Sequence, residues 1–148
     1  PPRSTLFPYT TLFRSVYEPV DVADGMSARP GKLALIYPVI DMGGAAHTGS
    51  RDRMLGPNPS QAEVERFSAD RNVTAATPST FLLHACDDMA VPVENSLLFH
   101  AACRKVGVEV EMHLYARGGH GFGHGGRITA DNPLRRWPEL FTEWYGRG

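Results

Sequence analysis

Three short apolar segments, each followed by a polar or glycine-rich loop, most restrict what this chain can fold into. They are Leu33–Ile40, Thr80–Ala85 and Val108–Tyr115. The first is a nearly continuous apolar run, which is typical of a strand buried on both faces of a parallel sheet, and the second is expected to be another buried strand. The first strand should end near Pro38, because proline cannot donate to the ladder. The third alternates apolar with charged or polar residues, which predicts one less buried face.

Helical patterns lie between and after these strands. The capping box Ser60-Gln61-Ala62-Glu63 predicts a short helix from Gln61 to about Phe67. A second helix is expected from about Pro92 to Gly107, which can act as its C-terminal cap. Its apolar residues recur every four positions, as Val93, Leu97 and Ala101.

A last helix is expected near the C-terminus, with Pro138 breaking it or marking its true start. Apolar residues recur there at helical spacing: Leu134, Trp137, Leu140, Phe141 and Trp144.

Strands that alternate with helices form right-handed parallel βαβ units, so the expected fold class is α/β. In such sheets ligands bind beyond the carboxyl ends of the strands. The loops Cys86–Ala90 and Arg117–Gly126 should leave the same rim, one with aspartates and the other with a histidine. The long connection at residues 41–79 is expected to be a cap-like insertion, because connections of this length usually carry function.

Composition excludes several partners. The net charge is −1 and no cluster of Lys and Arg is present, so no nucleic-acid partner is expected. No apolar run reaches about 18 residues, so no membrane span is expected. Cys86 and Cys103 lack disulfide or metal spacing, and we expect both to be buried free thiols.

The first residues, PPRSTLFPYTTLFRS, show neither a helical nor a strand period and lack the apolar core of a signal peptide. They resemble the in-frame translation of a short-read sequencing adapter. We expect residues 1–15 to be non-native and residues 16–148 to begin within a longer gene. Residues 16–148 predict neither a compartment nor an oligomeric state.

An aspartate after one strand and a histidine after the next follow the Ser…Asp…His order of an α/β-hydrolase. A serine hydroxyl needs an imidazole to take its proton, and the imidazole needs an acceptor on its other nitrogen. His120 is the candidate base. Asp88 and its neighbour Asp87 are rival candidates for the acid.

Residues 78–123, from PSTFLLHACDD to ARGGHGFG, resemble the C-terminal part of α/β-hydrolases. The most similar groups are the acetylxylan-esterase-like and dienelactone-hydrolase-like esterases, near the prolyl-oligopeptidase branch. Their pattern H-G/A-x-x-D-x-x-V-P and the G-G-H-G-F loop imply Asp88 as triad acid and His120 as triad base. The resemblance implies a three-layer αβα sandwich, no cofactor, and a small ester or acylated carbohydrate as substrate. It leaves Asp87 as a loop acid.

The other histidines have weaker claims to function. His84 is expected to be buried and hydrogen-bonded, and His47 could touch substrate from the cap region. His124 lies four residues after His120, but the glycines around it argue against a helical zinc pair, so no metal is expected. His100 and His113 are expected to lie on a helix and on the more polar face of a strand.

No G-x-S-x-G turn occurs in the sequence, although the family's serine requires one. Residues 25–29 come nearest, but Ser27 lies too close to the strand that follows for a helix to fit between them. We expect the serine upstream of Val16, so that this chain is inactive alone. The strand at Leu33–Val39 would then be an exposed, aggregation-prone edge, and the chain only marginally soluble.

Three functions remain open. The first is a serine esterase that acts on acylated carbohydrate or other small esters. The second is a peptidase of the prolyl-oligopeptidase kind, which shares the Asp and His motifs. The third is a hydrolase-like binding domain without catalysis.

Overall fold

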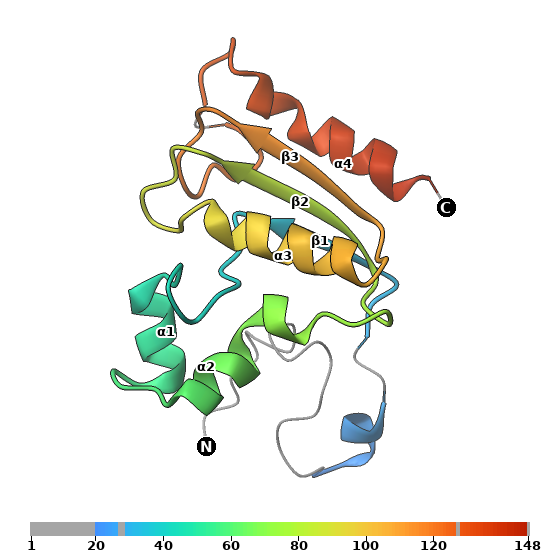
Figure 1. Cartoon of the computed structure of the whole chain (residues 1–148). Coiled ribbons are helices and arrows are strands. Elements are labelled where there is room, and N and C mark those ends of the chain that lie inside the picture. Colours follow the sequence, from blue (N-terminus) through green and yellow to red (C-terminus); the bar gives the residue numbers. More distant parts are fainter. Residues whose placement is uncertain (1–19, 27–28, 127, 148) are drawn as a thin grey trace.

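A parallel sheet of three strands organises the chain, which we describe from a computed structural model (Figure 1). The described residues are 20–26, 29–126 and 128–147, so the adapter-like residues 1–15 and Ser27 lie outside them. The strands are β1 (Lys32–Ile36), β2 (Ser79–Ala85) and β3 (Val110–Tyr115), in the order β1-β2-β3. All pairs are parallel, which confirms the expected strand type.

Alternation along β2 places a helix layer on each face of the sheet. Phe81 and Leu83 pack on the face covered by α4 (Trp137–Tyr145), whereas Leu82 packs on the face covered by α3 (Glu94–Lys105). Figure 1 shows the sheet between these two helices. All residues of β2 except Ser79 are buried, so the strand has a helix layer on both faces, and the predicted three-layer α/β fold is confirmed.

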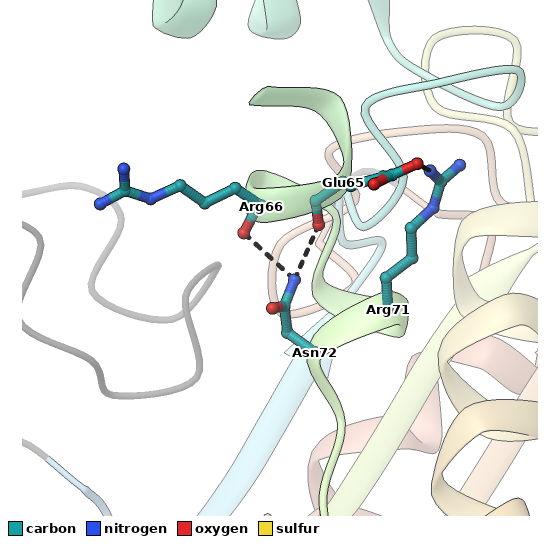
Figure 2. A pocket seen from close by; sticks show the side chains of 4 residues that line it. All are labelled: Glu65, Arg66, Arg71 and Asn72. Atoms are coloured by element: carbon teal, nitrogen blue, oxygen red, sulfur yellow. Dashed lines mark hydrogen bonds and ion pairs between the residues drawn. The ribbon is translucent and has the colours of Figure 1, made fainter. Parts of the chain in front are cut away.

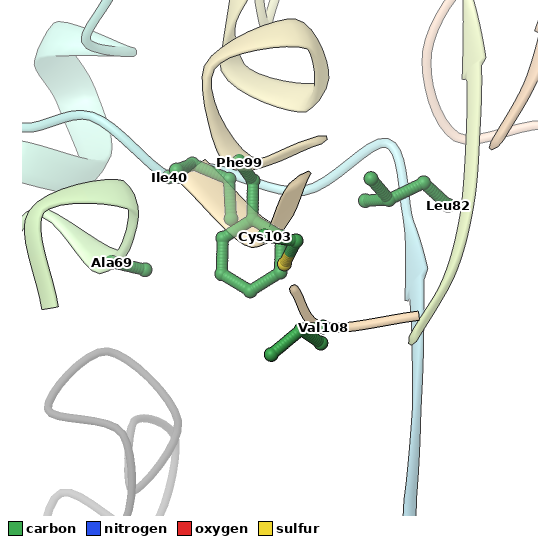
Figure 3. Packing of buried hydrophobic residues seen from close by; sticks show 6 residues of the cluster. All are labelled: Ile40, Ala69, Leu82, Phe99, Cys103 and Val108. Carbon is green, nitrogen blue, oxygen red and sulfur yellow. The ribbon is translucent and has the colours of Figure 1, made fainter. Parts of the chain in front are cut away.

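Two apolar clusters fill the two interfaces. The cluster on the α3 side is shown in Figure 3 and consists of Ile40, Ala69, Leu82, Phe99, Cys103 and Val108. The cluster on the α4 side consists of Phe81, Leu83, Ala85, Phe122, Leu134 and Trp144. Residues from the glycine-rich loop and the last helix thus pack together on β2, which fixes that loop against the sheet.

The connection between β1 and β2 holds α1 (Thr48–Leu55), α2 (Gln61–Phe67) and the short 3-10 helix η2 (Ala69–Asn72). The predicted α2 and its capping box are confirmed, since Ser60 Oγ accepts from the Glu63 N–H and the Glu63 carboxylate accepts from the Ser60 N–H. These helices lie on the α3 side of the sheet (Figure 1). That residues 41–79 act as a cap stays a prediction.

Side chains of α3 anchor this connection. Asn95 Oδ1 accepts from the N–H groups of Ile40 and Asp41, at 2.8 and 2.9 Å, and its amide donates to Ala45 O. Asn95 is completely buried, so these bonds replace those that it would make with water.

A 3-10 helix, η3 (Pro133–Arg136), runs directly into α4, and a further one, η1 (Val22–Gly25), precedes β1. Pro138 lies in the first turn of α4. Proline fits there because the N–H groups of the first helical turn have no acceptor within the helix, so the N–H that proline lacks is not needed. Pro138 therefore marks the start of the helix, which is one of the two expected alternatives.

The apolar face predicted for α3 is wrong. Leu97 is 41% exposed and Ala101 is exposed, whereas the buried residues are Asn95, Ser96, Phe99 and Cys103. Two polar residues lie in the buried face because their hydrogen-bond partners are on other elements, which hydrophobic spacing cannot reveal. The helix also begins at Glu94, after Pro92 rather than on it.

The prediction for β3 is also partly wrong. Its polar residues Glu111 and His113 are half-buried, while Leu114 is 39% exposed. His113 Nε2 lies 2.8 Å from a Glu111 oxygen, and Arg147 donates to the other oxygen at 2.8 Å. His113 and Glu111 are thus partners of each other, and Arg147 from the end of the chain pairs with Glu111, which explains why both tolerate burial.

The two cysteines differ in exposure, so the prediction of two buried thiols is wrong for Cys86. Cys103 is buried in α3, whereas Cys86 is exposed where β2 ends. Both are free thiols. Cys86 directly follows β2, and its N–H donates to Tyr115 O, at the end of β3, at 2.7 Å.

We expect Ellman's reagent at about pH 8 to modify one thiol per chain rapidly, at Cys86. Burial raises the pKa of the Cys103 thiol to about 11, which keeps it protonated at that pH, and the thiolate is the reactive form. Cys103 should react only after unfolding in urea. The Cys86→Ser variant should lose the rapid phase; two rapid thiols in the unsubstituted chain would contradict this prediction.

No helix within the described part of the chain is long and apolar enough to cross a membrane. Among the same residues, β1 pairs with β2 alone. The aggregation expected from its other edge stays a prediction.

Candidate active site

Two loops that follow neighbouring strands bring the candidate site together. Ala85 and Tyr115, the last residues of β2 and β3, are partners in the parallel register. Parallel strands end at the same rim, so the loop after β2 and the glycine-rich loop after β3 meet there, as expected. Asp87 and Asp88 come from the first loop and His120 from the second.

Asp88 is the carboxylate that contacts His120. Asp88 Oδ2 lies 2.7 Å from His120 Nδ1, while Oδ1 accepts from the N–H groups of Ala90 and Val91, each at 2.9 Å. The Asp88 side chain is completely buried, whereas that of His120 is 37% exposed. The pair thus has one buried, fixed member and one that faces solvent.

The surroundings of Asp88 favour its ionised form. Burial opposes ionisation, but the Val91 N–H, the His120 ring and the Ala90 N–H outweigh it and hold the pKa of the Asp88 carboxyl below its usual value. Asp88 is therefore a carboxylate at neutral pH, which can only accept hydrogen bonds. His120 Nδ1 must then carry the proton, which leaves the lone pair on Nε2.

Asp87 has a different partner. Its Oδ1 accepts from the N–H groups of both Gly118 and Gly119, at 2.8 Å each. The two neighbouring acids therefore divide two tasks: Asp88 contacts the imidazole, and Asp87 contacts the main chain just before it.

Glycine is required at two positions of the loop that carries His120. A Cβ atom on Gly118 would overlap Leu134 Cδ1 and come within 3.1 Å of the Ala85 Cβ. Gly119 has φ +61°, a conformation that costs energy for residues with a side chain. The loop thus packs closely on β2 and then turns His120 toward Asp88.

Tyr37 is part of the site although sequence reasoning missed it. Its ring lies 4.7 Å from the His120 ring and 4.7 Å from the Phe122 ring. Tyr37 has φ +42°, and its N–H donates to Leu83 O at 2.7 Å. This conformation ends the alternation of β1, so Tyr37 packs on the same apolar cluster as Ile36. Nothing in the sequence marks this turn except Pro38, which follows.

The remaining histidines have other partners. His47 is the N-terminal cap of α1, where Nδ1 accepts from the Ser50 N–H. His124 stacks on Trp137, with ring centroids 6.3 Å apart. His84 is completely buried and hydrogen-bonded, which confirms its expected environment. Substrate contact by His47 stays a prediction.

A pocket elsewhere in the molecule does not include these residues. Figure 2 shows it between α2 and η2, lined by Glu65, Arg66, Arg71 and Asn72. The Asn72 amide donates to the carbonyls of Glu65 and Arg66. We do not assign it to the reaction, because Asp88 and His120 lie outside it.

Within the residues described, no group of three or more His, Cys, Asp or Glu side chains could hold a metal ion. In the same part of the chain, Asp88 is the only hydrogen-bond partner of the His120 ring. What the arrangement offers chemically is a basic nitrogen, His120 Nε2, supported by a buried carboxylate. A pair with this geometry can serve as the acid and base of a nucleophilic triad.

Comparison with known proteins identifies relatives that share this part of the chain. Residues 34–145 match the sequence profile of the prolyl oligopeptidase family. Endo-1,4-beta-xylanase B of Butyrivibrio fibrisolvens is 36% identical over 121 residues, which are 82% of this chain and 17% of that protein. The acetylxylan esterase of Xylanibacter ruminicola is 33% identical over 102 residues, 66% of this chain and 21% of that protein.

A solved structure shows the same fold. The acetyl ester-xyloside bifunctional hydrolase from Caldicellulosiruptor lactoaceticus superposes with a TM-score of 0.79 and 39% sequence identity. The superposition covers 86% of this chain and 46% of that chain. This chain thus spans less than half the length of each of these three relatives.

Proposed function

Because this chain belongs to the prolyl oligopeptidase family of α/β-hydrolases, we propose that it is the acid–base part of a serine esterase. The proposed substrates are acetylated carbohydrates or other small esters. The observation that carries the proposal is the 2.7 Å contact between Asp88 Oδ2 and His120 Nδ1 at the carboxyl rim of a parallel sheet. Two similar proteins, an acetylxylan esterase and an acetyl ester-xyloside bifunctional hydrolase, support the ester class.

In this mechanism His120 Nε2 takes the proton of a serine hydroxyl as the serine oxygen attacks the ester carbonyl carbon. Asp88 keeps the Nδ1 proton in place and stabilises the positive charge that develops on the ring. The imidazolium then gives its proton to the leaving alkoxide, and an acyl-enzyme remains. Water, activated by the same nitrogen, hydrolyses the acyl-enzyme and restores the serine.

We further propose that the serine is not part of this chain. No G-x-S-x-G turn occurs among its 148 residues, and no hydroxyl or thiol group of a described residue bonds to His120. An oxyanion hole also needs the main-chain N–H that follows the serine. Under this proposal, the nucleophile and the oxyanion hole are both supplied by residues other than these 148.

The proposal predicts that the chain alone hydrolyses 4-nitrophenyl acetate no faster than its His120→Ala variant. Without nucleophile and oxyanion hole, only unspecific catalysis by surface groups remains. A fluorophosphonate probe should label neither protein. Rapid, stoichiometric labelling of one residue in the unsubstituted chain would show that it holds its own nucleophile.

A serine peptidase is the second candidate, because the family that matches is named for an oligopeptidase. Both candidates use the same acid and base, so substrate profiling of the full-length gene product separates them. We expect turnover of acetylated xylo-oligosaccharides and 4-nitrophenyl acetate. Cleavage of proline-containing peptides without ester turnover would favour the peptidase.

A further inference from the structure

A second histidine, which the proposed reaction does not use, lies behind Asp88. His84 is completely buried near the end of β2. Its Nδ1 lies 2.7 Å from Ser96 Oγ on α3. Its Nε2 lies 3.2 Å from Asp88 Oδ2 and 3.1 Å from Val91 O. The same Asp88 oxygen is therefore contacted by two imidazoles, His84 and His120.

The partners of His84 determine where its proton lies. Both groups that face Nε2, an ionised carboxylate and a main-chain carbonyl, can only accept hydrogen bonds, so Nε2 must donate. The Ser96 hydroxyl has no other hydrogen-bond partner among the residues described, and it is completely buried. Its proton therefore needs the Nδ1 lone pair as acceptor. Together these contacts select the neutral Nε2–H form of His84.

The Asp88 carboxylate then faces four N–H donors, of which the one from His84 is shared with Val91 O. Oδ1 accepts from the main chain at Ala90 and Val91, and Oδ2 accepts from His120 and His84. A completely buried carboxylate stays ionised only if its acceptor sites are filled. His120 is partly exposed and lies on a loop, whereas His84 lies on the central strand and is held by a helix.

We propose that His84 is a positioning residue, which holds Asp88 Oδ2 in place and ionised for His120; this rests on the role of Asp88 in the proposed function. Ser96 on α3 holds His84, and His84 contacts Asp88, so the position of Asp88 depends on α3 as well as on its own loop. The titratable groups in contact with Asp88 are His84 from β2 and His120 from the glycine-rich loop. The helix contributes the neutral Ser96, and the loop after β2 contributes main-chain N–H groups.

The first test needs no variant and no activity. Long-range ¹H–¹⁵N correlation spectra of the labelled 148-residue chain report which nitrogen of His84 is protonated. We expect the neutral Nε2–H form at neutral pH. The Nδ1–H form, an imidazolium, or a mixture of tautomers would overturn the proposal.

The second test uses a matched pair of variants. Gln at position 84 can place an N–H near the original Nε2, whereas Leu has similar bulk without a donor. We follow the Asp88 carboxyl ¹³C signal against pH in the unsubstituted chain, His84→Gln and His84→Leu. In His84→Leu, we expect Asp88 to bind its proton about tenfold more tightly, because a hydrogen bond to its ionised form is lost.

The Gln variant should retain the proton affinity of the unsubstituted chain. Equal proton affinities in all three proteins, or the same increase in both variants, would contradict a donor role for His84. Backbone amide spectra of α3 report whether each variant keeps the fold. The two tests measure the tautomer of His84 and the proton affinity of Asp88, and neither measures hydrolysis. They can therefore fail while the hydrolase proposal stands, and the hydrolase proposal can fail while they succeed.

Discussion

Asp88→Asn is expected to lower kcat for acetyl-ester hydrolysis on the order of 10⁴-fold in the longer serine esterase that we propose. Asn can still accept from Ala90 and Val91 with its amide oxygen in place of Oδ1. Its NH2 group then takes the place of Oδ2 and faces His120 Nδ1. An N–H donor there forces the lone pair of the imidazole onto Nδ1 and the proton onto Nε2, so the ring cannot accept the serine proton.

The matched control is Asp87→Asn, one residue away. Asp87 Oδ1 accepts from the Gly118 and Gly119 N–H groups, and the amide oxygen of Asn can do the same. We expect kcat to fall less than about tenfold, since the substitution removes only the negative charge of an exposed hydrogen-bond acceptor. Michaelis kinetics with 4-nitrophenyl acetate and circular dichroism of all three proteins provide the comparison. If Asp87→Asn caused the larger loss, the roles of the two acids would be reversed.

Ala at position 81 is expected to reduce the free energy of unfolding by about 3–5 kcal/mol. Phe81 is completely buried on the central strand. Its ring lies 5.7 Å from that of Phe141 and 5.6 Å from that of Trp144, and 5.1 Å from the His113 ring on β3. Truncation leaves a cavity between β2 and α4 that neither rigid element can close. Urea unfolding followed by circular dichroism measures the change.

Leu97→Ala is the control for this prediction. Leu97 lies on α3, is 41% exposed, and belongs to the helix face that hydrophobic spacing had suggested as buried. We expect a loss of about 0.5 kcal/mol or less, as is usual for exposed positions. A larger loss for Leu97→Ala than for Phe81→Ala would mean that α3 buries the face that its spacing predicted.

The fold was predictable where local sequence and tertiary environment agree. The segment Thr80–Ala85 contains the apolar run Phe81-Leu82-Leu83, whose side chains alternate between the two faces of the sheet, and burial of both faces requires a helix layer on each side. The Ser60–Glu63 capping box acts within one turn of helix, so it needs no distant partner. The capping box depends on contacts between near neighbours, and the burial of β2 is visible in the apolar residues of the strand itself.

Predictions failed where a polar group finds its partner far away in the sequence. Asn95 and Ser96 are buried because Ile40, Asp41 and His84 supply their hydrogen bonds. Tyr37 contacts His120 because its own left-handed backbone conformation, with φ +42°, ends the alternation of β1. Spacing within a single helix or strand contains no information about such partners.

The sequence by itself determined the parallel α/β architecture and the two loops that carry Asp88 and His120. Hydrophobic patterning and chain order suffice for this, because they dictate which segments are buried and at which rim parallel strands end. Only the tertiary structure decided which of two adjacent carboxylates meets the imidazole, and that His84 contacts the same oxygen. A hydrogen bond depends on tenths of an ångström and on the direction of each side chain, which are settled only when β2, β3 and α3 pack together.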